Sequence, residues 1–109
     1  MDQRAKIVAL NDAFRRDWAG KGRVFVTAGV AALPAAEQAI ILAHTRGFDE
    51  FSAENDPYGE HNFGSFERGG KTIFWRIDCY DRALKWASPN AADPSVTERV
   101  LTVMLADEY

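Results

Sequence analysis

The residues with the clearest chemical potential in this sequence surround His61, one of its two histidines. Two strand-like segments, 61–68 and 71–80, are separated by a pair of glycines that is typical of a hairpin turn. In that register His61 faces Asp78, and Arg76 lies on the diagonal. A carboxylate beside an imidazole fixes its tautomer, as a general base requires, and an arginine can hold an anionic substrate. The simpler interpretation is a polar pair that only stabilises the hairpin.

Other kinds of catalytic site find less support in the sequence. Glu60 and Asp56 could join His61 as metal ligands, but no second histidine or cysteine pair has the spacing of a metal site. Cys79 alternates onto the expected core face, where a thiol packs rather than reacts. No glycine-rich phosphate loop is present. We therefore expect no catalytic residue, no metal and no cofactor, and keep the histidine set as the alternative.

A recognition surface is the stronger interpretation of the same region. Phenylalanine, tyrosine and arginine are enriched at interface hot spots, and they gather on one face of the expected hairpin and in the segment before it. The expected binding residues are Glu54, Asp56, Tyr58, Glu60, His61, Phe63 and Arg76. The alternative is that a helix covers this face, which would make Phe63 and Phe74 part of the core.

Charge is unevenly distributed along the chain. Residues 1–23 hold six basic and three acidic side chains, whereas residues 48–60 hold five acidic side chains and no basic one. Such an acidic segment could steer a basic partner, and its carboxylates could take the place of phosphates in a nucleic-acid channel. The alternatives are an ordinary solvated surface and a DNA-binding accessory protein that uses the basic first helix.

Composition limits the class of protein. The chain has 109 residues, of which 47% are hydrophobic and 27% charged, as expected for a single domain over residues 1–109. The net charge of −3 argues against direct nucleic-acid binding. No apolar run is long enough to span a membrane, the first residues do not resemble a signal peptide, and one cysteine cannot form an internal disulfide. We expect a soluble cytoplasmic protein, and an apolar remainder on the sheet would favour a homodimer.

The periodicity of apolar residues predicts an α+β domain. Helices are expected at 3–18, ended by Gly20, and from Pro34 to Gly47; strands at 23–28, 61–68, 71–80 and 84–87; and a long loop at 48–58. Asp93-Pro94 is typical of a helix start, so the apolar residues after it predict a final helix. The expected order is helix-strand-helix-strand-strand-strand-helix, with three helices packed on one face of a small antiparallel sheet.

The expected hairpin register separates two faces of the sheet. Alternation places Phe66, Ile73, Trp75, Ile77 and Cys79 on the core face. Gly64 would then lie opposite Trp75, whose ring can cover the bare backbone of the glycine. The other face carries the aromatic and charged residues of the expected recognition surface.

Several segments resemble a family of small bacterial proteins that is known only as a domain of unknown function. They are ALNDAFR (9–15), VTAGVAALP (26–34), FDEFSAENDPYGEHNFGSFE (48–67), IFWRIDCYD (73–81) and DPSVTERVLTVMLADEY (93–109), and NDPYGEH followed by FG is the most specific. Two departures are Asn62, where members often have aspartate, and Cys79, where they often have an aromatic residue. The resemblance implies a small intracellular protein that is often carried with plasmid- or phage-derived genes, and it implies no catalytic residues.

Together these observations predict a small non-enzymatic interaction protein. The resemblance implies no activity, but small acidic proteins from such gene neighbourhoods are often interaction proteins, including inhibitors of host restriction or CRISPR systems, so we expect an inhibitor or modulator of that type. Its partner would be a protein or a protein–nucleic-acid complex, contacted through the acidic loop and the hairpin face. The alternative is a His-Asp acid–base enzyme that acts on an anionic substrate.

Overall fold

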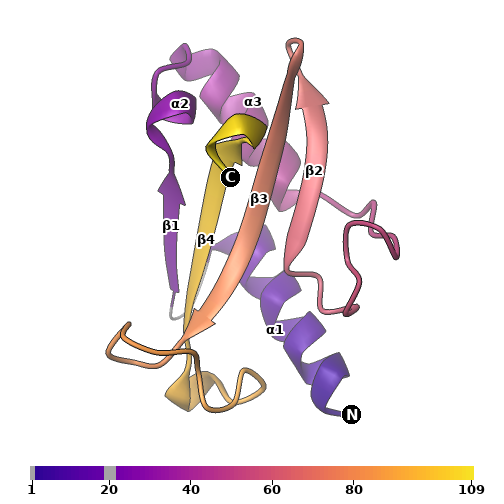
Figure 1. Ribbon diagram of the computed structural model, residues 1–109, viewed down its shortest axis with the longest axis vertical. Helices are drawn as coiled ribbons and strands as arrows, with labels where there is room; N and C mark the ends of the chain where they lie inside the picture. Colours follow the sequence, from indigo (N-terminus) through magenta and orange to yellow (C-terminus); the bar gives the residue numbers. More distant parts are fainter. Residues whose placement is uncertain (1, 19–21) are drawn as a thin grey trace.

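The computed structural model describes residues 2–18 and 22–109 and shows a four-stranded sheet with helices on one face (Figure 1). The helices are α1 (Gln3–Asp17), α2 (Ala28–Ala31) and α3 (Ala35–Arg46), and the strands are β1 (Gly22–Val26), β2 (Phe63–Arg68), β3 (Lys71–Tyr80) and β4 (Glu98–Leu105). Two short 3-10 turns, η1 (Pro94–Val96) and η2 (Ala106–Glu108), flank β4. The predicted α+β class is confirmed.

The hairpin of β2 and β3 forms in the predicted register. Gly64 pairs with Trp75 and Phe66 with Ile73. The turn is made by Gly69 and Gly70, whose φ angles of 59° and 77° lie in the left-handed region that a two-residue hairpin turn requires. The strand β2 begins at residue 63 rather than 61, which removes His61 from the ladder.

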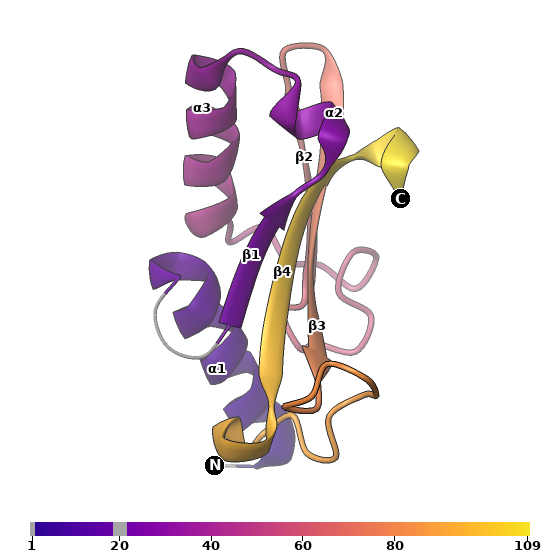
Figure 2. The ribbon, with the colours of Figure 1, turned by 90° about the vertical axis from the view of Figure 1, so that its left-hand side faces the viewer.

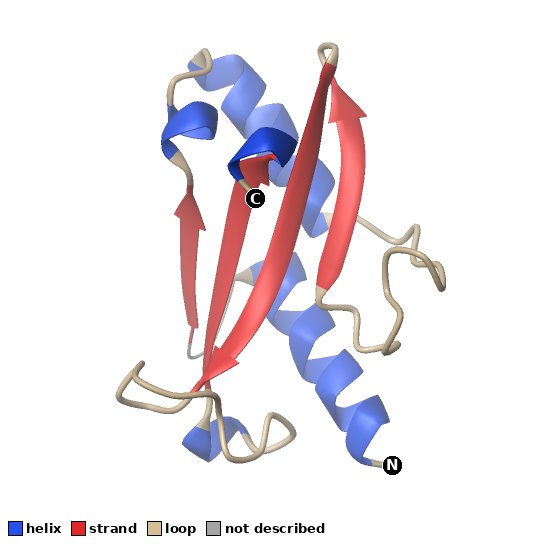
Figure 3. Ribbon diagram, in the orientation of Figure 1, coloured by secondary structure: helices blue, strands red, loops and turns tan. Residues whose placement is uncertain are grey.

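The strand order is β1-β4-β3-β2, so the last strand of the chain lies inside the sheet (Figure 3). β4 pairs antiparallel with β3 and parallel with β1. The sheet is therefore mixed, whereas a purely antiparallel sheet was expected. The parallel pair is possible because the chain between β1 and β4 includes α3 and the hairpin, which return it to the same end of the sheet.

The expected final helix is wrong, because residues 98–105 form β4. Asp93 does cap a turn by accepting a hydrogen bond from the backbone N–H of Ser95, but that turn ends at Val96. Beyond it Arg99, Leu101 and Val103 are buried in alternation, which is the period of a strand. The expected strand at 84–87 is also absent, since this segment forms a turn with one isolated bridge between Tyr80 and Ala87.

The helices α1 and α3 begin and end near the predicted residues, except that one predicted end lies outside the described part of the chain. Asp2 accepts a hydrogen bond from a first-turn N–H of α1, and Trp18 caps the other end with a left-handed φ of 53°. The expected terminator, Gly20, lies outside the described residues. Pro34 and Gly47 flank α3 as expected. Within the described ranges, no helix has the length and apolar character needed to cross a membrane.

The core lies between the sheet and the two longer helices. Its buried residues are Phe14, Ile41, Phe48, Phe66, Ile73, Trp75, Ile77, Leu101 and Val103. Cys79 packs against them and is partly buried, as its position in the alternation predicted. The Trp75 ring lies so close to Gly64 that a methyl group there would overlap it, which confirms the expected role of this glycine.

Within the described residues, no α-helix covers the opposite face of the sheet (Figure 2). This open face carries alternate residues of every strand, including Phe25, Phe63, Phe74 and Arg76, and the fractional exposure of Phe25 reaches 51%. The alternative that a helix covers Phe63 and Phe74 is therefore wrong for the described residues. Among the described residues, η2, Tyr109, part of the long loop before β2 and part of the loop after β3 extend over this side (Figures 1 and 2).

Candidate recognition groove

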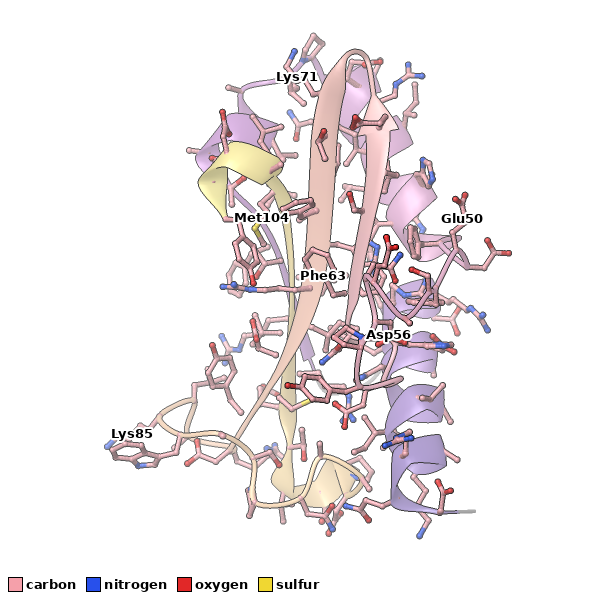
Figure 4. The ribbon with its side chains drawn as sticks, turned by 45° about the vertical axis from the view of Figure 1, so that its right-hand side comes forward. Glu50, Asp56, Phe63, Lys71, Lys85 and Met104 are labelled. Atoms are coloured by element: carbon pink, nitrogen blue, oxygen red, sulfur yellow. The ribbon has the colours of Figure 1, made fainter. Side chains whose placement is uncertain are left out.

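A groove of about 380 Å³ lies where the acidic loop meets the open face. We call it the recognition groove. Its lining residues are Glu54, Asn55, Pro57, Tyr58, Asn62, Phe63, Arg76, Ile77, Asp78 and Tyr109. Four of the seven expected binding residues line it: Glu54, Tyr58, Phe63 and Arg76. Figure 4 shows the loop segment that carries Asp56 beside the strand that carries Phe63. The groove thus joins two regions that sequence analysis connected only by chain proximity.

Arg76 is fixed at one side of the groove by two neighbours. Its Nε lies 3.1 Å from Oδ2 of Asp78, in an ion pair rather than a well-aligned hydrogen bond. Its guanidinium carbon lies 5.7 Å from the ring centroid of Tyr109, which is a cation–π contact. The two charged side chains are 43% and 39% exposed, so water screens the pair and leaves both groups accessible.

Aromatic rings form the apolar part of the site. Phe63 and Phe74 meet edge to face at 5.1 Å, and the Tyr109 ring lies 5.7 Å from Phe74. Tyr58 stands at the rim and is 73% exposed. An exposed tyrosine beside a packed aromatic cluster is the arrangement of an interface anchor, because it offers a large apolar area with little conformational entropy to lose.

Asp56 supports the loop from inside instead of contacting a ligand. Its side chain is almost fully buried, and its carboxylate accepts hydrogen bonds from the backbone N–H groups of Glu60 and His61. Gly59 adopts a left-handed φ of 64° within the same turn. Asp56 is therefore a positioning residue for Tyr58 and its neighbours, and its placement differs from that of an exposed binding residue.

His61 does not pair with Asp78, and that expectation is wrong. The backbone of His61 is left-handed, with φ of 55°, so the residue closes the loop before β2 begins. Its ring stacks on Phe51 at 3.7 Å, and its Nδ1 lies 3.1 Å from both carboxylate oxygens of Asp12 in α1. Nε2 lies 4.0 Å from Asp56. His61 thus joins the loop to the helix-covered side, away from the groove.

Glu60 also contributes to holding the loop. Its side chain is partly buried, and its backbone carbonyl accepts a hydrogen bond from Nδ2 of Asn11. Asn11 is itself buried on the inner face of α1. The far end of the acidic loop is therefore attached to α1 through both Glu60 and His61.

Two buried arginines on the helix-covered side were not anticipated. Nη1 of Arg15 donates to the backbone carbonyls of Thr45 and Arg46, which are the last carbonyls of α3, and Nη2 donates to Asp12. The guanidinium lies 4.9 Å from the Trp75 ring. Burial lowers the pKa of Arg15 from its usual value. A positive charge at a helix C-terminus complements the helix dipole, so Arg15 ties α1 to α3.

The second buried arginine, Arg99, lies on β4. Its Nε donates to Oδ1 of Asn11, and its Nη2 donates to the carbonyl of Ala91. Burial lowers its pKa and raises the pKa of the neighbouring Cys79 thiol. The sequence does carry a signal for both arginines: Arg15 continues the inward stripe of Ile7 and Asn11, and Arg99 alternates with the apolar residues of β4.

The comparisons with known proteins add a family but no activity. The family described as "Protein of unknown function (DUF3768)" matches residues 26–108. The chain belongs to this family. The match contains every groove residue except Tyr109, whereas α1 lies outside it. Neither the comparison with curated proteins nor that with solved structures found a match.

The described residues contain no cluster of three or more histidine, cysteine or acidic side chains arranged to hold a metal ion. The predicted His61–Asp78 pair is also not formed, because the two side chains lie on different sides of the sheet and the carboxylate beside the His61 ring is that of Asp12. What the site combines is an aromatic surface, an accessible ion pair and an acidic rim. These are the components of a surface that binds another macromolecule.

Proposed function

We propose that this protein is a non-enzymatic interaction protein that binds a basic surface of a macromolecular partner through the recognition groove. The observation that carries the proposal is the meeting of Glu54, Tyr58, Phe63 and Arg76 around one groove of about 380 Å³. These residues come from the acidic loop and from both strands of the hairpin. A surface built from separate segments keeps its shape without a ligand, which reduces the entropy lost on binding.

The acidic loop supplies the charge that attracts the partner. Asp49, Glu50 and Glu54 are exposed, whereas Asp56 and Glu60 are occupied with contacts inside the protein. Of these three accessible carboxylates Glu54 lines the groove, and an acidic loop that ends in an aromatic groove favours a partner rich in lysine or arginine. Because carboxylates steer association over a distance and aromatic rings hold the bound state, the two parts of the surface act at different stages of binding.

The partner class follows from this charge pattern. A protein or protein–nucleic-acid complex with a basic channel would accept the acidic loop in the place of phosphates. Blocking such a channel would make this protein an inhibitor or modulator of a nucleic-acid enzyme, of the anti-restriction or anti-CRISPR type that the family resemblance suggests for genes of mobile elements. Direct nucleic-acid binding is not part of the proposal, because the loop itself is acidic.

The test is affinity capture with matched charge variants. Wild-type protein, Glu54→Lys and Asp17→Lys are immobilised and exposed to lysate of the source cell, after circular dichroism confirms that each is folded. Both variants change one exposed carboxylate to an amine, so their net charges are equal, but Asp17 lies at the end of α1 on the other side of the sheet. We expect Glu54→Lys to lose the partner and Asp17→Lys to retain it.

A second arm identifies the mode of binding. A DNA duplex is added to the complex of this protein and its captured partner. If DNA displaces this protein from the partner, the result supports binding in the partner's nucleic-acid channel. The proposal is wrong if the captured partner binds wild type, Glu54→Lys and a Tyr58→Ala variant with the same affinity. Since Tyr58 and Glu54 are both exposed, their substitution tests the groove without disturbing the core.

A further inference from the structure

An exposed loop after β3 carries a second apolar surface that the recognition groove does not include. This loop, residues 81–87, projects from the sheet, and Figure 4 shows Lys85 at its outer end. Trp86 is 74% exposed and Leu84 is 38% exposed. A tryptophan and a leucine displayed together on a projecting loop are costly in water, and they indicate a contact that covers them.

The Trp86 loop, defined as residues 81–87, is held in one conformation. The backbone N–H of Asp81 donates to the carbonyl of Trp86 at 2.8 Å, and the N–H of Lys85 donates to the Asp81 carboxylate at 3.0 Å. Leu84 adopts a left-handed φ of 60°, which costs a leucine about 1 kcal/mol. The loop therefore presents Trp86 as a rigid anchor, with little further entropy to lose on contact.

The charge of this loop is opposite to that of the groove. Arg82 and Lys85 are exposed beside Trp86. In the groove, the positive charge of Arg76 is offset by Asp78, and among the described residues no cation forms an ion pair with Glu54. The loop is thus basic and aromatic, and the groove is acidic and aromatic. The two surfaces are therefore complementary: their charges have opposite sign, and both offer aromatic rings.

The two surfaces also face the same way. Figure 2 shows the acidic loop and the segment after β3 extending to the side of the sheet that is opposite α1 and α3. A second copy that approaches the open face after a two-fold rotation can therefore place its Trp86 loop at the groove while its own groove receives the first copy's loop. Each side would contribute about 800 Å² to a standard interface, roughly an eighth of the 6305 Å² accessible surface.

We propose that the open face is the interface of a two-fold homodimer in which each copy's Trp86 loop enters the other's recognition groove. Trp86 lies against Tyr58 and Phe63, and Lys85 pairs with Glu54, in both directions. The part of the open face between the two loops is then covered. One consequence rests on the function proposed above: the groove holds either a second copy or the basic partner, so dissociation of the dimer must precede partner binding.

The test is a charge exchange between two variants. Sedimentation velocity is measured from about 5 to about 500 μM for wild type, Lys85→Glu, Glu54→Lys, and an equimolar mixture of the two variants. Each loop–groove contact occurs twice in a two-fold dimer, so each single variant loses two ion pairs. Because each lost pair weakens association about tenfold, the dissociation constant of the dimer rises about 100-fold. In the mixture one contact is native and the other is reversed in both partners, so the heterodimer forms as wild type does.

The controls separate this contact from general charge effects and from misfolding. Lys71→Glu changes the same charge on an exposed lysine at the hairpin turn and leaves the dimer intact. Trp86→Ala dissociates the dimer, and the emission of wild-type tryptophan shifts to shorter wavelength as the concentration rises. Circular dichroism checks the fold of each variant.

The inference is overturned if wild type is monomeric throughout the range, if Lys85→Glu and Glu54→Lys associate as wild type does, or if their mixture stays monomeric. A monomeric wild type that still captures its partner through Glu54 would remove the dimer and leave the proposed function standing. A dimer that is restored by mixing, in a protein that captures no partner, would support the dimer and remove the proposed function.

Discussion

Two arginines on opposite faces of one sheet show how the covering layer decides the role of a side chain. Arg15 is fully buried with its guanidinium 4.9 Å from the Trp75 ring, and Arg76 is 43% exposed with its guanidinium 5.7 Å from the Tyr109 ring. Each also meets a carboxylate. Helices enclose the first, so its contacts must be satisfied within the protein. The second faces water and can exchange an internal contact for an external one.

The comparison teaches that residue type alone does not mark a binding site. The inner arginine and its aromatic neighbours hold α1, α3 and the sheet together, whereas the same residue types on the open face form a groove. The two arginines differ in their contact with water. Burial removes water from Arg15 and lowers its pKa, whereas the Arg76 side chain stays exposed to water. The difference leads to predictions about stability on one face and about binding on the other.

The largest effect is expected on the covered face, from Arg15→Met. The change leaves the carbonyls at the end of α3 without their donor and removes one partner of Asp12. Breaking a buried charged network of this kind costs about 3 to 5 kcal/mol of unfolding free energy. Urea unfolding measures it. Arg16→Met, on the exposed side of the same helix, is the control and should cost less than about 0.5 kcal/mol. Equal losses of unfolding free energy in the two variants would show that burial does not make Arg15 more important for stability than Arg16.

A smaller effect is expected where the loop joins the two faces, from Asp56→Ala. The substitution leaves two partly buried backbone N–H groups without an acceptor, at a cost of about 1 to 3 kcal/mol. Hydrogen exchange of the Glu60 and His61 amides should accelerate more than exchange in β3. Glu50→Ala, an exposed acid of the same loop outside the groove, should change neither stability nor exchange. Unchanged protection in Asp56→Ala would show that its carboxylate does not hold the loop.

A pH-dependent effect is expected from Glu108, an exposed carboxylate in η2, the turn that follows β4. Hydrogen bonds from the Thr27 hydroxyl and from the backbone N–H groups of Leu105 and Gly29 lower its pKa from the usual 4.5. A lowered pKa stabilises the folded state above the usual value, and the stabilisation is lost as the pH falls through the folded-state value. Glu108→Gln should therefore be less stable than wild type at pH 7, with a difference that shrinks below about pH 4. A difference that stays constant from pH 7 to pH 3 would contradict this.

The smallest effect on stability is expected on the open face, from Arg76→Ala. Exposed ion pairs contribute little, so the unfolding free energy should change by less than about 1 kcal/mol. Binding of the partner should nonetheless weaken strongly, because arginine is among the residues that dominate interfaces. Calorimetric or biosensor titration with the captured partner measures the loss. A large loss of stability without loss of binding would reverse the roles assigned to the two faces.

The sequence predicted those features that depend on local signals. The glycine pair determined the hairpin register, Asp2 and Pro34 marked the helix starts, and alternation along β3 identified the core face. Part of the groove lining was predicted, because Phe63 and Arg76 lie on the face that alternation assigns to them, and binding through these residues stays a prediction. These signals are local because each depends on backbone geometry or side-chain direction within a few residues.

The features that could not be predicted depend on contacts between distant segments. The residues of β4 are apolar on both faces, so a helix and a strand were equally compatible with them, and pairing with β1 and β3 decides for the strand. The left-handed backbone of His61 is rare for a residue other than glycine, and it moves the ring from Asp78 to Asp12. Asp56 looked like an exposed acid because its two amide partners become visible only once the loop is folded.

The central position of β4 has a consequence for how the molecule assembles. The hairpin of β2 and β3 can form early, because its strands are adjacent in sequence. In the described part of the chain β1 pairs only with β4, 77 residues later, as in the pair of Gly22 and Arg99. During synthesis β1 therefore remains unpaired until the last strand, β4, emerges and inserts between β1 and β3. We expect slow, late closure of the sheet at this seam, and a nascent chain that stops before residue 98 should expose β1 to chaperones and proteases.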